Sequence, residues 1–319
     1  MTIVRRSKPG PREPLEIDGR QLMLSSLDKV LWPSTGFTKR QLIGFYRAVA
    51  PALLPHLRRR PLTLGRGPDG VEGLRWYQTN CRGHPDWIAT HDLVGKQGQP
   101  LRMCVVDDLP SLVWVANLGT LELHPHLWLT ARPGQPTSVV FDLDPIEPAG
   151  LSDCCRVAVV LRDRLDAMGL DGVAKTSGSA GLHIFVPLAP GHSWSETKAF
   201  ARMIAKELAE LDPGLITDRS ARPKRRGKVL VDWLQNEPMR STVAPYSLRA
   251  QVRPWVSTPV TWSEVEAALA HDRPGILRFG PDDVLARLDR SGDLFAPVLA
   301  SGQALLPSPA TSDHAVRRV

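Results

Sequence analysis

Cysteine and long apolar runs are scarce in this chain of 319 residues. The four cysteines, Cys81, Cys104, Cys154 and Cys155, lack the spacing of two pairs that marks a structural zinc site. We therefore expect ordinary reduced thiols. No apolar run is long enough to span a bilayer, and the basic, proline-rich start has no apolar stretch behind it, unlike a secretory signal. These absences predict a cytoplasmic, nucleoid-associated protein.

Internal repeats and clean linkers are also lacking, so we do not divide the chain into independently folding parts. We expect a flexible basic arm at residues 1–14, one large domain at 15–299, and a disordered tail at 300–319, where small residues and proline dominate. With 42% hydrophobic residues the chain can bury a substantial core, and its net charge of +7 favours a polyanionic partner.

Hydrophobic periodicity predicts strands and helices interleaved along the chain, which indicates a mixed α/β or α+β fold. The expected helices are 38–57, 109–118, 151–168, 194–211, 262–270 and 281–290. The first should be capped by Thr38 and kinked or divided at Pro51. Residues 61–73 are expected to form a strand followed by a Gly-rich turn, and the other expected strands are 101–106, 120–124, 138–142, 182–188 and 228–233.

Two aspartates follow an apolar strand in the segment Phe141-Asp142-Leu143-Asp144-Pro145. Strand residues two apart point to the same face, so Asp142 and Asp144 should lie side by side. Paired carboxylates resist joint ionisation unless a cation lies between them, and Mg²⁺ and Mn²⁺ prefer such oxygen ligands. A solvated acidic turn is the simpler alternative for an isolated pair.

A second apolar strand also ends in a carboxylate, at Asp232. Three carboxylates from two strands are typical of two-metal phosphoryl chemistry. Asp107 and Asp108 form a competing acidic pair, which we interpret as a cap of the helix that starts at Leu109.

Two further segments could contact phosphates. Residues 175–183 form a Ser/Gly-rich turn between strands, which is suited to anion binding but lacks the Walker A spacing. Residues 219–228 form a basic run that leads directly into the Asp232 strand. Each is more often an ordinary turn or a solvated surface when it occurs alone.

The ordered set of motifs resembles the polymerase domain of bacterial ligase D, an end-joining primase-polymerase of the archaeo-eukaryotic primase superfamily. The resemblance covers residues 22–295. It rests on the segments DKVLWP (28–33), TGFTK (35–39), RPLT (60–63), PDG (68–70), VDDL (106–109), LELHP (121–125), VFDLDP (140–145), TSGSAGLH (176–183), VDWLQN (231–236) and TVAPYSLR (242–249).

The resemblance implies an archaeo-eukaryotic primase-like core with two intimately packed β-sheet subdomains flanked by helices. It also implies two divalent cations, Mn²⁺ or Mg²⁺, held by Asp142, Asp144 and Asp232. The nucleotide contacts that it implies are Trp76, Tyr77, His124, Ser177, His183, Gln235 and Arg249. The contacts that it implies to a DNA 5′-phosphate or the template are Ser26, Lys29, Lys39, Arg66 and Arg225.

Three positions depart from the family pattern. Ser26 stands where asparagine is common, and Gly65 and Ala180 stand where basic residues are common. The last two remove positive charge beside the expected nucleotide and template, which bears on binding strength more than on the reaction.

The implied activity is template-directed addition of nucleotides, preferably ribonucleotides, to a 3′-hydroxyl at short gaps or DNA ends during non-homologous end joining. We expect a stand-alone form that works with a separate DNA ligase and a Ku-like protein. Three alternatives remain open: gap filling in excision repair with another ligase, a non-catalytic module that binds DNA ends, and phosphodiester hydrolysis.

Overall fold

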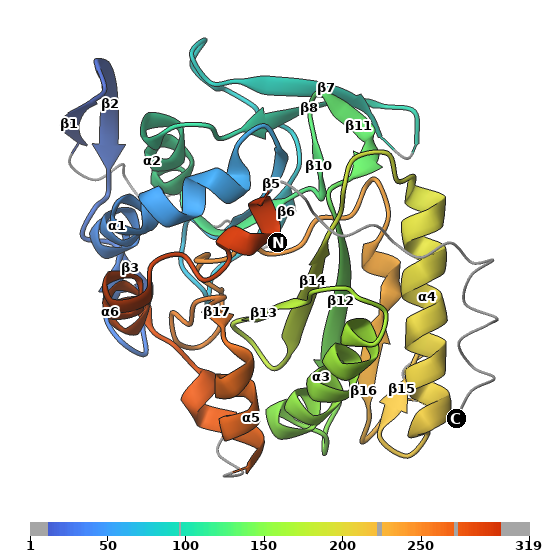
Figure 1. Cartoon of the computed structure of the whole chain (residues 1–319). Coiled ribbons are helices and arrows are strands. Elements are labelled where there is room, and N and C mark those ends of the chain that lie inside the picture. The colour runs from blue at the N-terminus through green and yellow to red at the C-terminus, as the bar shows by residue number, and fades with distance from the viewer. Residues whose placement is uncertain (1–11, 96, 222–224, 271–273, 301–319) are drawn as a thin grey trace, which may run out of the picture.

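The computed structural model describes residues 12–95, 97–221, 225–270 and 274–300 (Figure 1). Residues 12–14 of the arm expected at 1–14 belong to strand β1 (Arg12–Ile17). Residues 1–11 and nearly all of the tail expected at 300–319 lie outside the described residues. No described helix has the length and apolar character needed to cross a membrane.

A six-stranded sheet forms the half of the molecule that contains the paired aspartates. Its strand order is β15 (Ile216–Thr217), β16 (Val229–Asp232), β12 (Ser138–Pro145), β14 (Leu182–Pro187), β13 (Val173–Thr176) and β17 (Pro259–Val260). All neighbours are antiparallel except β15 and β16. Helices α3 (Leu151–Asp166) and α4 (Trp194–Leu211) pack against β12.

A five-stranded sheet forms the other half. It comprises β6 (Trp76–Gln78), β5 (Pro61–Arg66), β8 (Pro100–Val105) and β7 (Thr90–Val94), with β9 (Thr120–Pro125) also paired to β5. Helices α1 (Lys39–Leu57) and α2 (Leu109–Asn117) pack together and contact β9. The two sheets with their helices confirm the predicted mixed fold.

Short elements complete the fold. The short strands form two-stranded sheets. These pair β1 with β2 (Arg20–Ser25), β3 (Val30–Trp32) with β4 (Phe37–Thr38), and β10 (Trp128–Leu129) with β11 (Arg132–Pro136). Helices α5 (Trp262–Ala270) and α6 (Pro281–Ser291) and the 3₁₀ turns η2 (Trp233–Gln235), η3 (Pro274–Leu277) and η4 (Ala296–Leu299) follow.

The predicted helix caps are present. The Thr38 side chain accepts a hydrogen bond from the backbone N–H of Gln41 at the start of α1, and Asp108 caps α2 through Ser111. The predicted division of the first helix at Pro51 is wrong, since α1 runs on through Pro51 and Pro55. Its apolar face is fully buried, and this packing outweighs the loss of hydrogen bonds at the two prolines.

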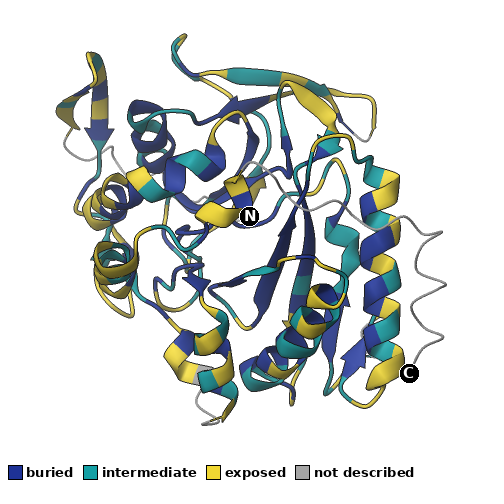
Figure 2. Ribbon diagram, in the orientation of Figure 1, coloured by how far each residue is buried: buried dark blue, intermediate teal, exposed yellow. Residues whose placement is uncertain are grey.

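One hydrophobic core joins both sheets, from Ile17 through the strands and helices to Val284. Figure 2 shows the central strands as its buried part. The prediction of four reduced thiols is wrong for two of them, because Cys81 and Cys104 form a disulfide. The fold brings their Cα atoms to 5.0 Å although they lie 23 residues apart. Cys154 and Cys155 are free and buried in α3, as expected.

Candidate active site

Strand β12 places Asp142 between two polar side chains on neighbouring strands. In the sheet register Asp142 lies opposite His183 of β14 and opposite Asp232 of β16. The intervening Leu143 is fully buried. The strand thus projects Asp142 and Asp144 from one face, as the alternation predicts, and brings Asp232 beside them.

The carboxylates differ in charge environment. Burial raises the pKa of Asp142, but the interaction with His183, whose Nε2 lies 3.2 Å from Oδ1, leaves this pKa below its usual value. For Asp232, burial and the nearby charge of Asp142 raise the pKa, although the backbone N–H of Leu234 donates to it. Two carboxylates that oppose each other's ionisation are an arrangement that a cation would stabilise.

Asp144 is already neutralised by an arginine. Its carboxylate forms an ion pair with Arg225, at the end of the basic run. As the described side chains stand, no three His, Cys, Asp or Glu groups converge closely enough to hold a metal ion. The donor chemistry nevertheless fits hard divalent cations, because three carboxylates lie on adjacent strand positions and the pKa of Asp232 is raised by burial and by the charge of Asp142. Binding through Asp144 requires Arg225 to move.

The Ser/Gly loop closes over β12. Its Ser177 hydroxyl oxygen accepts hydrogen bonds from the backbone N–H groups of Ser179 and Gly181, both at 3.1 Å. A Cβ atom at Gly181 would lie 2.0 Å from the carbonyl oxygen of Leu143, so only glycine fits this position. The loop therefore lies directly against the strand that carries the aspartates.

Glu122 of β9 connects three of the predicted nucleotide contacts. Its carboxylate oxygens lie 2.8 Å from His124 Nε2, 3.1 Å from Arg249 Nε and 3.4 Å from the Tyr77 hydroxyl. Burial raises the pKa of Glu122, but His124 and Arg249 outweigh it and lower the pKa to about 2. Arg249 also donates to the carbonyl oxygen of Ser177 at 2.7 Å.

Glu122 was not predicted as a site residue. The signal was present in the segment Leu121-Glu122-Leu123-His124, where an acidic residue interrupts an apolar strand and shares a face with the histidine. A buried carboxylate requires polar partners, and here these are the side chains of His124, Arg249 and Tyr77.

Lys175 of β13 is a second residue that sequence reasoning missed. It is fully buried, and its Nζ lies 3.0 Å from His183 Nδ1 and donates to the Ser257 hydroxyl at 2.7 Å. Burial and the charge of Lys175 lower the pKa of His183 to about 4, so the imidazole is neutral near pH 7. Its Nε2 faces the Asp142 carboxylate and carries the proton, which leaves Nδ1 to accept from Lys175.

Of the aromatic pair on β6, Tyr77 lies beside His124 and Glu122 at the edge of the site, whereas Trp76, the preceding strand residue, packs with Arg66. Trp76 is 40% exposed and Tyr77 is 63% exposed, and the Tyr77 ring meets the His124 ring edge-on at 5.2 Å. Arg66 stacks on Trp76 at 5.5 Å. These side chains are accessible to a planar ligand.

Ser26, Lys29 and Lys39, which the resemblance assigns to a 5′-phosphate contact, lie together outside the cavity that Asp142 and Asp144 line. The backbone N–H of Lys29 donates to the Ser26 carbonyl, and that of Lys39 donates to the Lys29 carbonyl. Lys29 pairs with Asp69, while Lys39 Nζ donates to the Ser25 carbonyl at 2.7 Å. Burial, with the charges of Lys29 and Arg66, lowers the pKa of Lys39 to about 8.

A cavity of about 280 Å³ collects most of the predicted nucleotide-side residues. Gln235 donates to Asp142 Oδ2 at 3.4 Å within it. The predicted residues that line this cavity are His124, Asp142, Asp144, Ser177, His183, Gln235 and Arg249, together with Ala180. Asp232 lies beside Asp142 on the next strand, and the β6 aromatic pair and the lysine cluster lie outside this lining.

Comparison with known proteins agrees with this arrangement. Residues 38–295 match the family described as LigD, primase-polymerase domain. The chain is 36% identical over 282 residues to the multifunctional non-homologous end joining protein LigD of Mycolicibacterium smegmatis, covering 87% of this chain and 36% of that protein. The bifunctional non-homologous end joining protein LigD of Bacillus subtilis is 28% identical over 297 residues, covering 91% of this chain and 45% of that protein.

Among solved structures, the polymerase domain from Mycobacterium tuberculosis ligase D in complex with DNA superposes with a TM-score of 0.81 at 34% identity. That match covers 87% of this chain and 97% of the solved chain. The chain thus spans about a third of the length of the mycobacterial relatives but nearly all of one of their domains. The family match over most of the chain and the shared fold together show that this chain belongs to the LigD primase-polymerase domain family.

Proposed function

We propose that this chain catalyses template-directed nucleotidyl transfer to a 3′-hydroxyl at short gaps or DNA ends during non-homologous end joining. The observation that carries the proposal is the placement of Asp142, Asp144 and Asp232 on two paired strands beside the Ser/Gly loop. Family membership supports a polymerase, and the printed names of the relatives support an end-joining pathway.

The carboxylates are proposed to hold two divalent cations, Mn²⁺ or Mg²⁺. Such cations, when bound, supply activation of the attacking oxygen and charge neutralisation at the leaving phosphate. His183 donates to Asp142 and keeps this carboxylate oriented and ionised. Gln235 steadies the second oxygen of the same carboxylate.

The nucleotide is proposed to occupy the cavity of about 280 Å³. Arg249 and the backbone N–H groups of the Ser177 loop would face its phosphates, and His124 would face its sugar. Trp76 and Tyr77 would stack on bases, because stacking tolerates any base sequence, as copying of a template requires. The same cavity is proposed to favour ribonucleotides.

DNA is proposed to contact two basic regions. Ser26, Lys29 and Lys39 would grip a 5′-phosphate across the gap, and their shared backbone hydrogen bonds support a preformed cluster. Arg66 and Arg225 would face the template. A Ku-like protein and a DNA ligase are the proposed partners, since the relatives are end-joining proteins.

The decisive test is extension of a primer across a 5′-phosphorylated gap with Mn²⁺ and each nucleotide type. We expect incorporation by the unaltered chain, with ribonucleotides preferred. Asp142→Asn removes one negative charge at the proposed metal site and should lower incorporation by more than about 100-fold while DNA binding persists. Asp289→Asn, on the exposed face of α6, is the matched control.

Lys29→Gln separates recognition of the 5′-phosphate from nucleotide incorporation. It should abolish discrimination between 5′-phosphate and 5′-hydroxyl gaps and leave extension of a simple primer-template intact. An unaltered chain that binds gapped DNA but incorporates no nucleotide with either metal would contradict the polymerase proposal and favour a module that only binds ends.

A further inference from the structure

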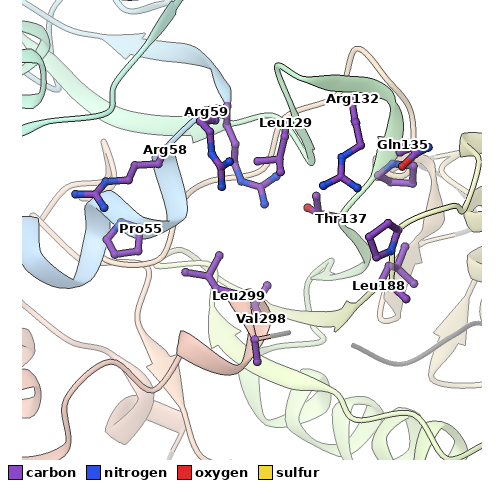
Figure 3. A pocket seen from close by; sticks show the side chains of 15 residues that line it. Pro55, Arg58, Arg59, Leu129, Arg132, Gln135, Thr137, Leu188, Val298 and Leu299 are labelled. Carbon is purple, nitrogen blue, oxygen red and sulfur yellow. The ribbon is translucent and has the colours of Figure 1, made fainter. Parts of the chain in front are cut away.

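A larger cavity, of about 560 Å³, lies apart from the proposed active site (Figure 3). It forms where the end of α1 meets strands β10 and β11, the segment after β14 and the turn η4. It shares no lining residue with the cavity that contains Asp142 and Asp144. A volume of this size falls within the usual range for ligand sites, which is roughly 300–1,000 Å³.

Four arginines line this cavity, which we call the arginine pocket: Arg58, Arg59, Arg60 and Arg132. No aspartate or glutamate is among the described residues that line it. Arg60 is only 9% exposed, and one of its N–H groups donates to the His126 carbonyl at 3.2 Å. Within the described chain, neither Arg60 nor Arg132 has a carboxylate partner. At Arg60 and Arg132 the pocket therefore has positive charge that no carboxylate of the described residues neutralises.

The backbone holds consecutive arginines at this pocket by an unusual conformation. Arg59 has a φ of 56°, in the left-handed region that side-chain-bearing residues seldom adopt. Asp107 stabilises the turn, because its Oδ1 accepts from the Arg59 N–H at 2.6 Å and its carbonyl oxygen accepts from Arg58 Nε at 3.2 Å. Figure 3 shows the side chains of Arg59 and Arg132 directed into the cavity. Strain of this kind persists where surrounding contacts enforce it, often at binding sites.

Apart from Gln135 and Thr137, the rest of the lining is aliphatic. Leu129, Leu188 and Val298 are buried or partly buried there, and Leu299 is 38% exposed. No aromatic ring is among the described lining residues, so the pocket has no surface on which a nucleobase could stack. Guanidinium groups beside an aliphatic surface complement a ligand that carries both carboxylates and aliphatic groups.

We propose that the arginine pocket binds an acidic peptide segment of a partner protein, with carboxylates at the four arginines and an aliphatic side chain against Leu129, Leu188 and Leu299. The site is separate from the catalytic cavity and does not depend on the proposed polymerase activity. It gives this chain a means to be recruited by a protein while its DNA-binding surface stays open.

The test uses the full chain and a small panel of fluorescein-labelled peptides that mix aspartate or glutamate with leucine, measured by fluorescence anisotropy. We expect saturable binding that weakens by at least roughly tenfold in the double variant Arg59→Gln/Arg132→Gln. The same loss should follow when asparagine replaces aspartate in the peptide. Leu299→Ser should weaken binding independently of salt, and Arg290→Gln, exposed on α6, is the matched control and should change nothing.

A second measurement distinguishes a peptide from nucleic acid. Gapped DNA should bind the double variant as tightly as the unaltered chain, and nucleotide incorporation should be unchanged. The proposal is overturned if no peptide binds below about 1 mM, if the double variant binds peptides normally, or if single-stranded DNA displaces the peptide and loses affinity for the double variant.

Discussion

At the scale of single residues, Glu122 determines how the nucleotide-side groups are arranged. A carboxylate at this position orients His124, Arg249 and Tyr77 together, so three side chains from different strands and loops share one anchor. Gly65 faces it across the sheet, where an added Cβ would lie 2.8 Å from Glu122 Cβ. Position 65, where basic residues are common in the family, therefore holds a glycine at a point where the packing against Glu122 is close.

Lys175 is expected to act as a positioning residue through His183. Lys175→Met removes the donor to His183 Nδ1, so the imidazole can rotate or change tautomer and orient Asp142 less well. We predict a roughly 10- to 100-fold lower kcat, with the KM for nucleotide nearly unchanged. Steady-state incorporation kinetics measure this, with Lys206→Met on the exposed face of α4 as the control. A change in KM alone would contradict the role.

The depressed pKa of Lys39 predicts a pH dependence. Its pKa of about 8 means that the ammonium is charged below pH 8 and loses its charge as the pH rises above it. The preference for a 5′-phosphorylated gap should therefore decline between pH 7 and pH 9. Binding to 5′-phosphate and 5′-hydroxyl gaps across this range measures the effect. In Lys39→Gln the pH dependence should disappear, and its persistence there would assign it to another group.

At the scale of elements, the long helices were predictable because each combines a cap with an apolar stripe. Helix α4, for example, begins after Ser193 and buries Phe200, Ala201 and Ile204, as its periodicity indicates. The short strands β1–β4, β6, β7, β10, β11, β15 and β17 were missed, as was the four-residue β13 inside the six-stranded sheet. Two- to six-residue strands that pair only with each other, or at a sheet edge, have too few residues to display an alternating pattern.

The disulfide links the segment after β6, the strand of Trp76 and Tyr77, to β8 inside the five-stranded sheet. Cys81 follows β6 and Cys104 lies in β8, so the bond closes the loop that contains β7. We predict that Cys81→Ser lowers the free energy of unfolding by about 3 kcal/mol. Because one core joins both sheets, hydrogen exchange through global unfolding should accelerate in β12 and β16 as well, and exchange at residues 76–94 should accelerate further through local opening. Acceleration at residues 76–94 that is no greater than in β12 would contradict the local role of the bond.

At the scale of the whole molecule, the fold class and the carboxylate triad could be predicted from the sequence. The contacts between segments that are distant in the chain could not. Buried polar partners such as Glu122 with Arg249, or Cys81 with Cys104, are separated by many residues in the chain. Their proximity is produced by tertiary packing, which local periodicity does not encode. The arginine pocket was missed for the same reason, since it assembles from four separate segments.

The shared core predicts cooperative unfolding of both sheets. Leu112 of α2 is fully buried and belongs to the same hydrophobic cluster as Ile184 of β14. Leu112→Ala should cost about 2–5 kcal/mol of stability, and the loss should reach amides of both sheets. Denaturant-dependent hydrogen exchange at β5 and β14 measures this. Destabilisation confined to β5 would mean that the halves unfold separately.

The ion pair between Arg225 and Asp144 has a thermodynamic consequence. A divalent cation bound at the proposed metal site would compete with the Arg225 guanidinium for the Asp144 carboxylate, so its binding would release Arg225. The released arginine is then available to a phosphate, and a phosphate that holds it away from Asp144 leaves that carboxylate free. Each ligand therefore increases the affinity for the other by the same factor, as linkage requires. Without a bound cation Asp144 is paired with Arg225, and the proposed coupling between metal and polyanion would reside in this one arginine side chain.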